Sequence, residues 1–146
     1  MYQYKYTNDD LNLHHFEFEG LIQEREVNEF KETFLKILNK NKLFYFIIDI
    51  SKIDSFDLRF FMSIRSLIDK NKILVKSWLG GSSIIVSSRY SGILNLLMKL
   101  KKSYAPNYIT SSIESAIQFL LGIHQQKIGV WIRLSFKKLN NNNISY

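Results

Sequence analysis

The stretch LFYFIIDI, residues 43–50, decides the fold. Its first six residues are all apolar, so the run offers no position suited to face solvent. A strand covered on both faces of its sheet has this composition, because helices or loops pack against each side. We therefore predict that residues 43–50 form the central strand of a sheet.

Amphipathic runs alternate with short strand-like runs on both sides of this strand. Apolar residues three and four apart predict helices over 26–40, the run after residue 57, 89–101 and 111–121. Alternating or short buried runs predict strands over 2–7, 11–19, 83–88 and 107–110. This order predicts an α/β fold, with a single mixed, mostly parallel sheet flanked by about four helices and entered by an antiparallel pair.

The middle of the chain leaves one boundary open. Residues 57–78 fit either one helix or two elements that break near Asn71. Gly80 and Gly81 predict a turn before the strand at 83–88. In the following helix, the expected apolar stripe consists of Ile93, Leu96, Leu97 and Leu100.

The chain beyond Gly122 has a different pattern. Between residues 128 and 136 the apolar side chains stand two apart, with charged residues between them, which predicts an extra C-terminal strand. The asparagine-rich end predicts a disordered tail. The expected organisation is a domain over 1–122, a strand extension over 123–138 and a tail over 139–146.

Composition narrows the class of protein. The 146 residues suit one domain, and 46% hydrophobic residues exclude a chain that is disordered throughout. The sequence has no cysteine, which excludes disulfides, cysteine–zinc sites and a thiol nucleophile. The opening residues lack the pattern of a signal peptide, so we expect a soluble cytoplasmic protein.

The formal charge of +7 is unevenly distributed. Residues 1–60 hold 8 Lys and Arg against 11 Asp and Glu, whereas residues 61–146 hold 12 against 2. Such asymmetry suits an anionic partner, although basic solvated surfaces are also common without one.

Several phrases resemble the STAS superfamily, and within it the SpoIIAA-like group of small bacterial proteins. The resemblance extends over about residues 11–122. It rests on FIIDIS at 46–51, the loop with Asp54 and Ser55, SSIIVSSRYSGILNLLMKL at 82–100 and YAPNYITSSIESAIQFL at 104–120.

The resemblance implies a compact module without enzymatic activity that serves protein–protein regulation or small-ligand sensing. Anti-sigma-factor antagonists of the superfamily carry Asp-Ser, then a phosphorylated Ser or Thr, then Gly. Phe56 occupies the phosphoacceptor position here and Asp57 replaces the glycine, so the usual serine phospho-switch is not expected. The group is also akin to lipid-transfer domains of the CRAL-TRIO type, which supports a lipid function only as fold analogy.

Two serines remain candidates for phosphorylation. Ser51 and Ser55 precede a predicted helix, whose unpaired N–H groups and dipole favour a phosphate. Serine and aspartate at such positions also serve as helix caps, and capping is the simpler interpretation.

A second candidate site follows the strand at 83–88. Ser87, Ser88 and Arg89 combine hydroxyls, helix N–H groups and a guanidinium at the end of a strand, where open α/β sheets bind ligands. We therefore consider an anion or polar-ligand site there. The histidines and carboxylates show no metal-ligand spacing, and no cofactor is predicted.

Basic residues of the second half define a possible basic surface. Its members are Lys99, Lys101, Lys102, Arg133, Lys137 and Lys138, with Lys127 beside them. No nucleic-acid motif accompanies them, so nucleic acid is not the expected partner. Trp131 beside Arg133 leaves peripheral contact with a membrane or a protein open.

The predicted strand at 128–136 needs an edge with which to pair. It can complete its own sheet or add to that of a second subunit, which leads to the hypothesis of a homodimer through this segment. For the whole chain we expect a regulatory module that binds a protein partner or small ligand. The alternative is a module that binds lipid or an anionic membrane surface.

Overall fold

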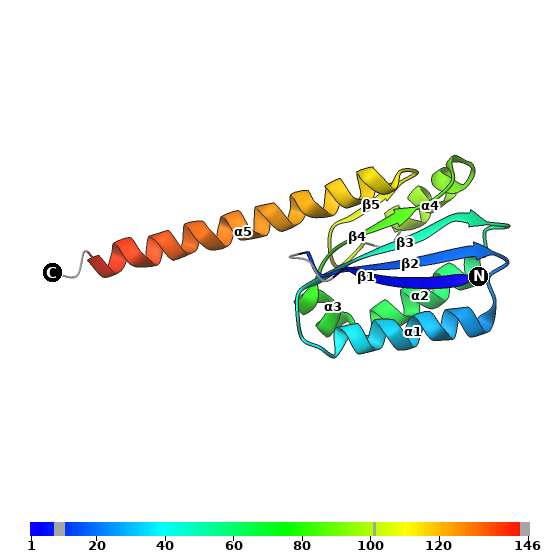
Figure 1. Ribbon diagram of the computed structural model, residues 1–146, viewed down its shortest axis with the longest axis horizontal. Helices are drawn as coiled ribbons and strands as arrows, with labels where there is room; N and C mark the ends of the chain where they lie inside the picture. Colours follow the sequence, from blue (N-terminus) through cyan, green and yellow to red (C-terminus); the bar gives the residue numbers. More distant parts are fainter. Residues whose placement is uncertain (8–10, 101, 144–146) are drawn as a thin grey trace.

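The computed structural model describes residues 1–7, 11–100 and 102–143. The strands are β1 (Tyr2–Thr7), β2 (Leu13–Gly20), β3 (Phe44–Ile53), β4 (Leu79–Ile85) and β5 (Asn107–Thr110). The helices are α1 (Glu24–Leu38), α2 (Leu58–Lys70), α3 (Lys72–Trp78), α4 (Ser88–Leu100) and α5 (Ile113–Asn143). Figure 1 shows how they surround one sheet.

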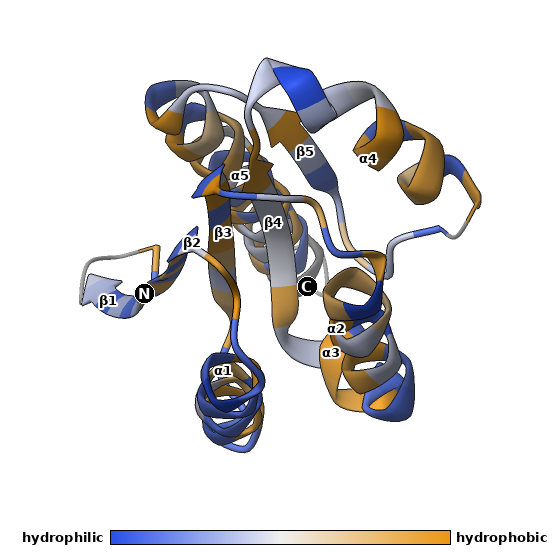
Figure 2. Cartoon of the chain, turned by 90° about the vertical axis from the view of Figure 1, so that its right-hand side faces the viewer, coloured by the Kyte–Doolittle hydropathy of each residue, from blue (hydrophilic) through white to orange (hydrophobic). Residues whose placement is uncertain are grey.

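The sheet has the order β1-β2-β3-β4-β5, with the predicted strand as its centre. β1 pairs with β2 antiparallel, and the other neighbours are parallel. Because each parallel strand lies beside its predecessor, right-handed crossovers place α1 to α4 on one face of the sheet. α5 follows the edge strand β5 and covers the other face (Figure 2).

β3 separates two apolar clusters because its side chains alternate between the faces. Phe44, Phe46 and Ile48 pack with α1, α2 and α3 in the larger cluster. Tyr45 and Ile47 pack with the first part of α5 in the smaller one. The predicted mixed α/β sheet is confirmed, and its core lies on both faces of β3.

Residues 57–78 form two helices, which settles the boundary that the sequence left open. Asn71 lies between α2 and α3 with φ −114° and ψ 26°, outside helical geometry. Its side-chain Nδ2 donates to the Leu67 carbonyl at 2.9 Å, so the end of α2 is capped by the residue that breaks it.

The predicted turn at Gly80 and Gly81 is wrong, because both residues lie within β4. A Cβ on Gly80 would lie 2.5 Å from the Tyr45 Cζ atom, and one on Gly81 would lie 3.0 Å from Ile123 Cδ1. The glycines therefore let the Tyr45 ring and α5 approach the strand closely.

The predicted strand at 128–136 is also wrong, since α5 runs without interruption from Ile113 to Asn143. The first part of α5 packs on β4 and β5, whereas residues 128–136 project beyond the sheet (Figure 1). A helix without a neighbour has no buried face to impose a helical period, so the alternation was misleading. The expected tail is helical over 139–143, and residues 144–146 lie outside the described part.

Candidate functional site

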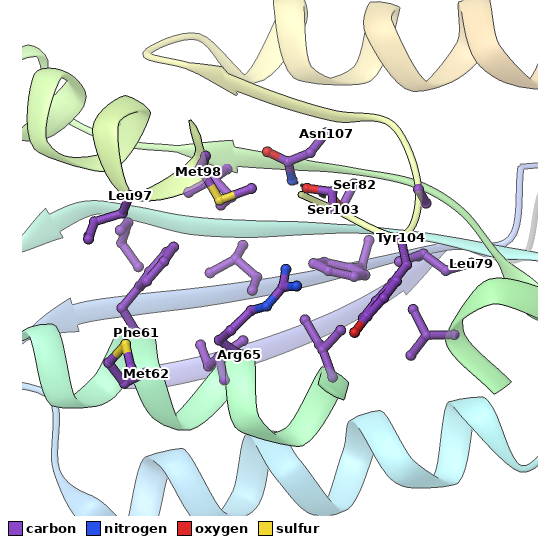
Figure 3. Close-up of a pocket in the computed structure, with 18 of the residues that line it drawn as sticks. Phe61, Met62, Arg65, Leu79, Ser82, Leu97, Met98, Ser103, Tyr104 and Asn107 are labelled. Atoms are coloured by element: carbon purple, nitrogen blue, oxygen red, sulfur yellow. Dashed lines mark hydrogen bonds between the residues drawn. The ribbon is translucent and has the colours of Figure 1, made fainter. Parts of the chain in front are cut away.

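A cavity of about 280 Å³ lies between the sheet and the helices α2 and α4. Phe46, Ile48 and Ile84 form its floor from β3 and β4. Phe61 and Met62 of α2 line one wall, as Figure 3 shows. Leu97, Met98 and Leu100 of α4 and the loop residues Ser103, Tyr104 and Ala105 complete the enclosure. The cavity is thus built almost entirely from apolar side chains.

The cavity exists because α4 is seated loosely on the sheet. Within α4, all of whose residues are described, only Leu94 is fully buried. The prediction that the apolar stripe of this helix is its buried face is therefore wrong, because Ile93, Leu96 and Leu100 are 50%, 60% and 73% exposed. Leu97 and Leu100 line the cavity instead of filling the space above β4. Few side chains of α4 therefore attach it to the sheet.

Charged and polar groups gather at one end of the cavity. The Arg65 Nε atom lies 3.2 Å from Asp69 Oδ1, an ion pair whose alignment falls short of a hydrogen bond. Arg65 Nη2 donates to the Lys102 carbonyl at 2.9 Å. The Tyr104 hydroxyl donates to Asp69 Oδ1 at 2.9 Å, and the Arg65 guanidinium lies 5.2 Å from the centre of the Tyr104 ring. These contacts tie the loop after α4 to α2.

The residues Arg65, Asp69 and Tyr104 at this end of the cavity carry no net charge together. The hydrogen bond to Asp69 raises the pKa of Tyr104, with smaller contributions from burial and from the Asp69 charge. Tyr104 thus keeps its proton, and the charge of Arg65 is balanced by Asp69. Within the group Arg65, Asp69 and Tyr104 the charges balance, and the Lys76 ammonium lies 5.3 Å from the centre of the Tyr104 ring.

A second polar pair lies on the floor of the cavity. Asn107 Nδ2 of β5 donates to Ser82 Oγ of β4 at 2.6 Å, and Ser82 is buried. This pair places a hydroxyl and an amide beside otherwise apolar walls (Figure 3). Such a pair can orient a ligand that carries one polar group.

The two candidate phosphorylation sites are not equivalent in the structure. Ser51 lies in β3, and its Oγ donates to Asp49 Oδ1 at 2.6 Å. Ser55 is exposed in the loop that follows. The cap of α2 is neither serine but Asp57, whose Oδ1 accepts from the Arg59 backbone N–H at 2.9 Å.

The residues Ser87, Ser88 and Arg89 lie at the start of α4, as expected. Ser88 and Arg89 are exposed, and the guanidinium stacks 5.3 Å from the centre of the Tyr90 ring. That ring is 5.9 Å from the Phe56 ring, so the loop before α2 and the start of α4 are neighbours. The loop that carries Ser55 and the start of α4 thus lie side by side beyond the ends of β3 and β4.

The possible basic surface is divided between two parts of the molecule. Lys99 and Lys102 lie at the end of α4 and just after it, and Lys101 lies outside the described residues. Arg133, Lys137 and Lys138 belong to the part of α5 that projects beyond the sheet (Figure 1). The two groups therefore do not form one continuous surface.

The histidines occupy structural positions. His14 and His15 face opposite sides of β2, as their adjacency predicts, and Tyr4 Oη lies 2.6 Å from His14 Nδ1. His124 lies on α5, with its Nδ1 atom 3.1 Å from Tyr45 Oη. Across the described ranges, no group of three His, Cys, Asp or Glu residues is arranged to hold a metal ion.

Sequence reasoning missed the cavity and its polar end. Arg65 and Tyr104 are 39 positions apart, and each reads as an ordinary surface residue in its own segment. No local signal marks the cavity, because the small number of buried residues in α4 is visible only in the structure. No helix in the described part of the chain is long and apolar enough to cross a membrane.

Comparisons with known proteins agree with this architecture. No family model and no curated protein matches the sequence. A solved structure of an uncharacterised DUF3478-family protein with a SpoIIAA-like fold, from Shewanella loihica PV-4, matches with a TM-score of 0.60. The two chains are 14% identical, and the match covers 82% of this chain and 92% of the other. The chain therefore has a SpoIIAA-like fold.

Proposed function

We propose that the protein is a non-enzymatic STAS-type module that binds one small, mostly apolar molecule in the cavity between α2 and α4. The observation that carries this proposal is an apolar space of about 280 Å³ bounded by several elements of the fold. Pockets for drug-sized ligands begin at about 300 Å³, so a space of about 280 Å³ suits a smaller molecule. A ligand in this space would make apolar contacts with the side chains that line it.

The chemistry of the lining favours an uncharged ligand. The charge of Arg65 is already balanced by Asp69, so a carboxylate or phosphate would have to compete with that ion pair. Ser82 and Asn107 can instead satisfy a hydroxyl or carbonyl group. The expected ligand is thus an alcohol, aldehyde or ketone with a short apolar body.

α4 supplies the means by which such a ligand would act. A ligand beneath Leu97 and Met98 would add apolar contacts to a helix that buries only Leu94. Binding would then order α4 and the loop that Arg65 and Tyr104 hold. A change in the seating of α4 would alter the surface that a regulatory partner meets.

Thermal unfolding with paired probes tests the proposal. We expect 1-octanol to raise the Tm and sodium octanoate to have a much smaller effect. At a free ligand concentration 100 times Kd, the stabilisation is about 2.7 kcal/mol. For a chain of this size that corresponds to a Tm increase of roughly 5–10 °C.

A filled cavity is the matched control. Ala105→Phe places a ring into the space, whereas Ile73→Phe enlarges a side chain that is 75% exposed on α3. The octanol effect should vanish in the first variant and persist in the second. Met98→Trp fills the cavity from α4, in case Ala105→Phe does not fold. An equal response in the filled and unfilled proteins would refute the assignment.

A further inference from the structure

α5 serves two different purposes along its length. Its first part packs on the sheet through Ala116, Leu120 and Ile123, and His124 contacts Tyr45. The remainder, residues 125–143, projects away from the fold (Figure 1). At 1.5 Å per residue this projecting segment is roughly 27 Å long. No packing of the domain explains why it should be helical and apolar.

The projecting segment exposes large apolar side chains. Trp131 is 70% exposed, Phe136 63% and Ile132 44%. Ile128, Val130, Leu134 and Leu139 are between 44% and 60% exposed. Adjacent exposed apolar residues of this size mark a surface that is covered when the protein works.

The apolar residues include one well-defined stripe. Ile128, Ile132, Phe136 and Leu139 follow one another at spacings of four, four and three, which places them on one side of the helix. Trp131 lies at the border of this stripe. Around the helix, Lys127 and Lys138 lie outside the stripe, next to Trp131. Arg133 lies outside the stripe on the opposite side, beyond Phe136. The stripe is thus apolar in the middle and basic on both sides.

Charge decides which occupant fits the stripe. Lys127, Arg133, Lys137 and Lys138 all lie in the segment, and no Asp or Glu follows Glu114 in the sequence. A second copy of the segment would bring cations against cations, which is unfavourable. An anionic lipid surface pairs with the basic flanks and also receives the apolar stripe.

We infer that residues 125–139 of α5 lie on the surface of an anionic lipid bilayer, with Ile128, Ile132 and Phe136 entering the boundary between headgroups and acyl chains. Trp131 takes the interfacial position that tryptophan favours. The flanking Lys and Arg side chains reach the lipid phosphates. The segment lies along the membrane plane, in agreement with the absence of a spanning helix among the described residues.

The test uses the full chain and vesicles of known composition. Trp78→Phe leaves Trp131 as the only tryptophan, because the sequence contains two. We expect its emission to shift to shorter wavelength with vesicles of phosphatidylcholine and phosphatidylglycerol, and not with phosphatidylcholine alone. The same vesicles should retain the protein at low salt and release it as salt shortens the range of the attraction.

Matched variants separate the stripe from the general charge. Lys127→Gln/Arg133→Gln should weaken vesicle binding about 25-fold, since each basic residue near the surface contributes about fivefold. Lys72→Gln/Lys99→Gln removes the same net charge elsewhere and should change binding much less. Ile132→Gln/Phe136→Gln should weaken binding about tenfold or more, whereas Ile73→Gln on α3 should not.

Three results would overturn the inference. The first is no retention on anionic vesicles at low salt. The second is equal weakening by the two charge variants. The third is a dimer by light scattering, with Trp131 emission already shifted before vesicles are added, which would assign the stripe to a second copy. Ala105→Phe should keep full vesicle binding, so this test is independent of the cavity.

Discussion

The Tyr104 hydroxyl donates a hydrogen bond to Asp69 Oδ1 at 2.9 Å, across 35 positions of the sequence. Asp69 also pairs with Arg65, which holds the Lys102 carbonyl. These contacts fasten the loop that closes one end of the cavity to α2. The Tyr104–Asp69 bond is therefore one of the contacts by which α2 holds the loop, beside the bond from Arg65 to the Lys102 carbonyl.

Removal of the Tyr104 hydroxyl should loosen this closure. In Tyr104→Phe the ring stays over Arg65 while the bond to Asp69 is lost, so we expect faster amide hydrogen exchange over residues 102–107. Exchange in β3 should not change, because its bonds lie in the centre of the sheet. Tyr108→Phe, at an exposed tyrosine of β5, is the control. Equal exchange in both variants would show that the hydroxyl does not hold the loop.

The two glycines with the most different surroundings give opposite predictions. Gly80→Ala should destabilise the protein by about 1–3 kcal/mol, because its Cβ would meet the Tyr45 ring at 2.5 Å. Gly92→Ala should stabilise it by roughly 0.5–1 kcal/mol, because a Cβ within α4 would meet nothing within 4 Å. Urea unfolding measures both. A stable Gly80→Ala protein would mean that the contact of Tyr45 with β4 is misplaced.

His14 makes stability depend on pH. Burial lowers the His14 pKa from 6.5 to about 4, with a smaller contribution from Lys40. Below about pH 6.5 the His14 imidazole is protonated in the unfolded chain, whereas in the folded chain it stays neutral until about pH 4. The free energy of unfolding should therefore fall as the pH decreases from 7 to 5. His14→Phe keeps a ring beside Tyr6 and Phe44 but removes this titration, so the loss should be smaller. Burial also lowers the pKa of His15, which therefore contributes to the pH dependence in the same direction. An unchanged pH dependence in urea unfolding of His14→Phe would contradict the assignment.

Asp57, which caps α2, should contribute more to stability than Ser55, which precedes it. Asp57→Ala should cost about 0.5–2 kcal/mol, because the Arg59 N–H loses its acceptor. Ser55→Ala should change stability by less than about 0.5 kcal/mol, as expected at an exposed loop position. Thermal unfolding of the two variants compares them directly, and a larger effect at Ser55 would reverse the roles.

Much of the architecture could be predicted because it follows from local patterns. The apolar run from Phe44 to Ile48 has no solvent-facing position, which suffices to place it at the centre of a sheet. The stripe of α1 has the helical period because Phe30, Phe34 and Leu38 all face that sheet. Local periodicity and tertiary burial agree in these elements.

The errors arose where distant residues decide the local structure. Gly80 lies in β4, which pairs with β3, and the Tyr45 ring packs where a Cβ of residue 80 would stand. Residues 128–136 alternate in polarity, yet they continue a helix that begins on β4 and β5. The cavity depends on how α4 and α2 are spaced, and no segment alone contains that spacing.

Native mass spectrometry of the protein purified from its own host tests the central claim most directly. The account predicts a mass above that of the chain by one small, uncharged, mostly apolar molecule, present in the wild type and absent from Ala105→Phe. The bare chain mass for the wild type, or the same bound molecule in both proteins, would contradict a ligand in the cavity between α2 and α4.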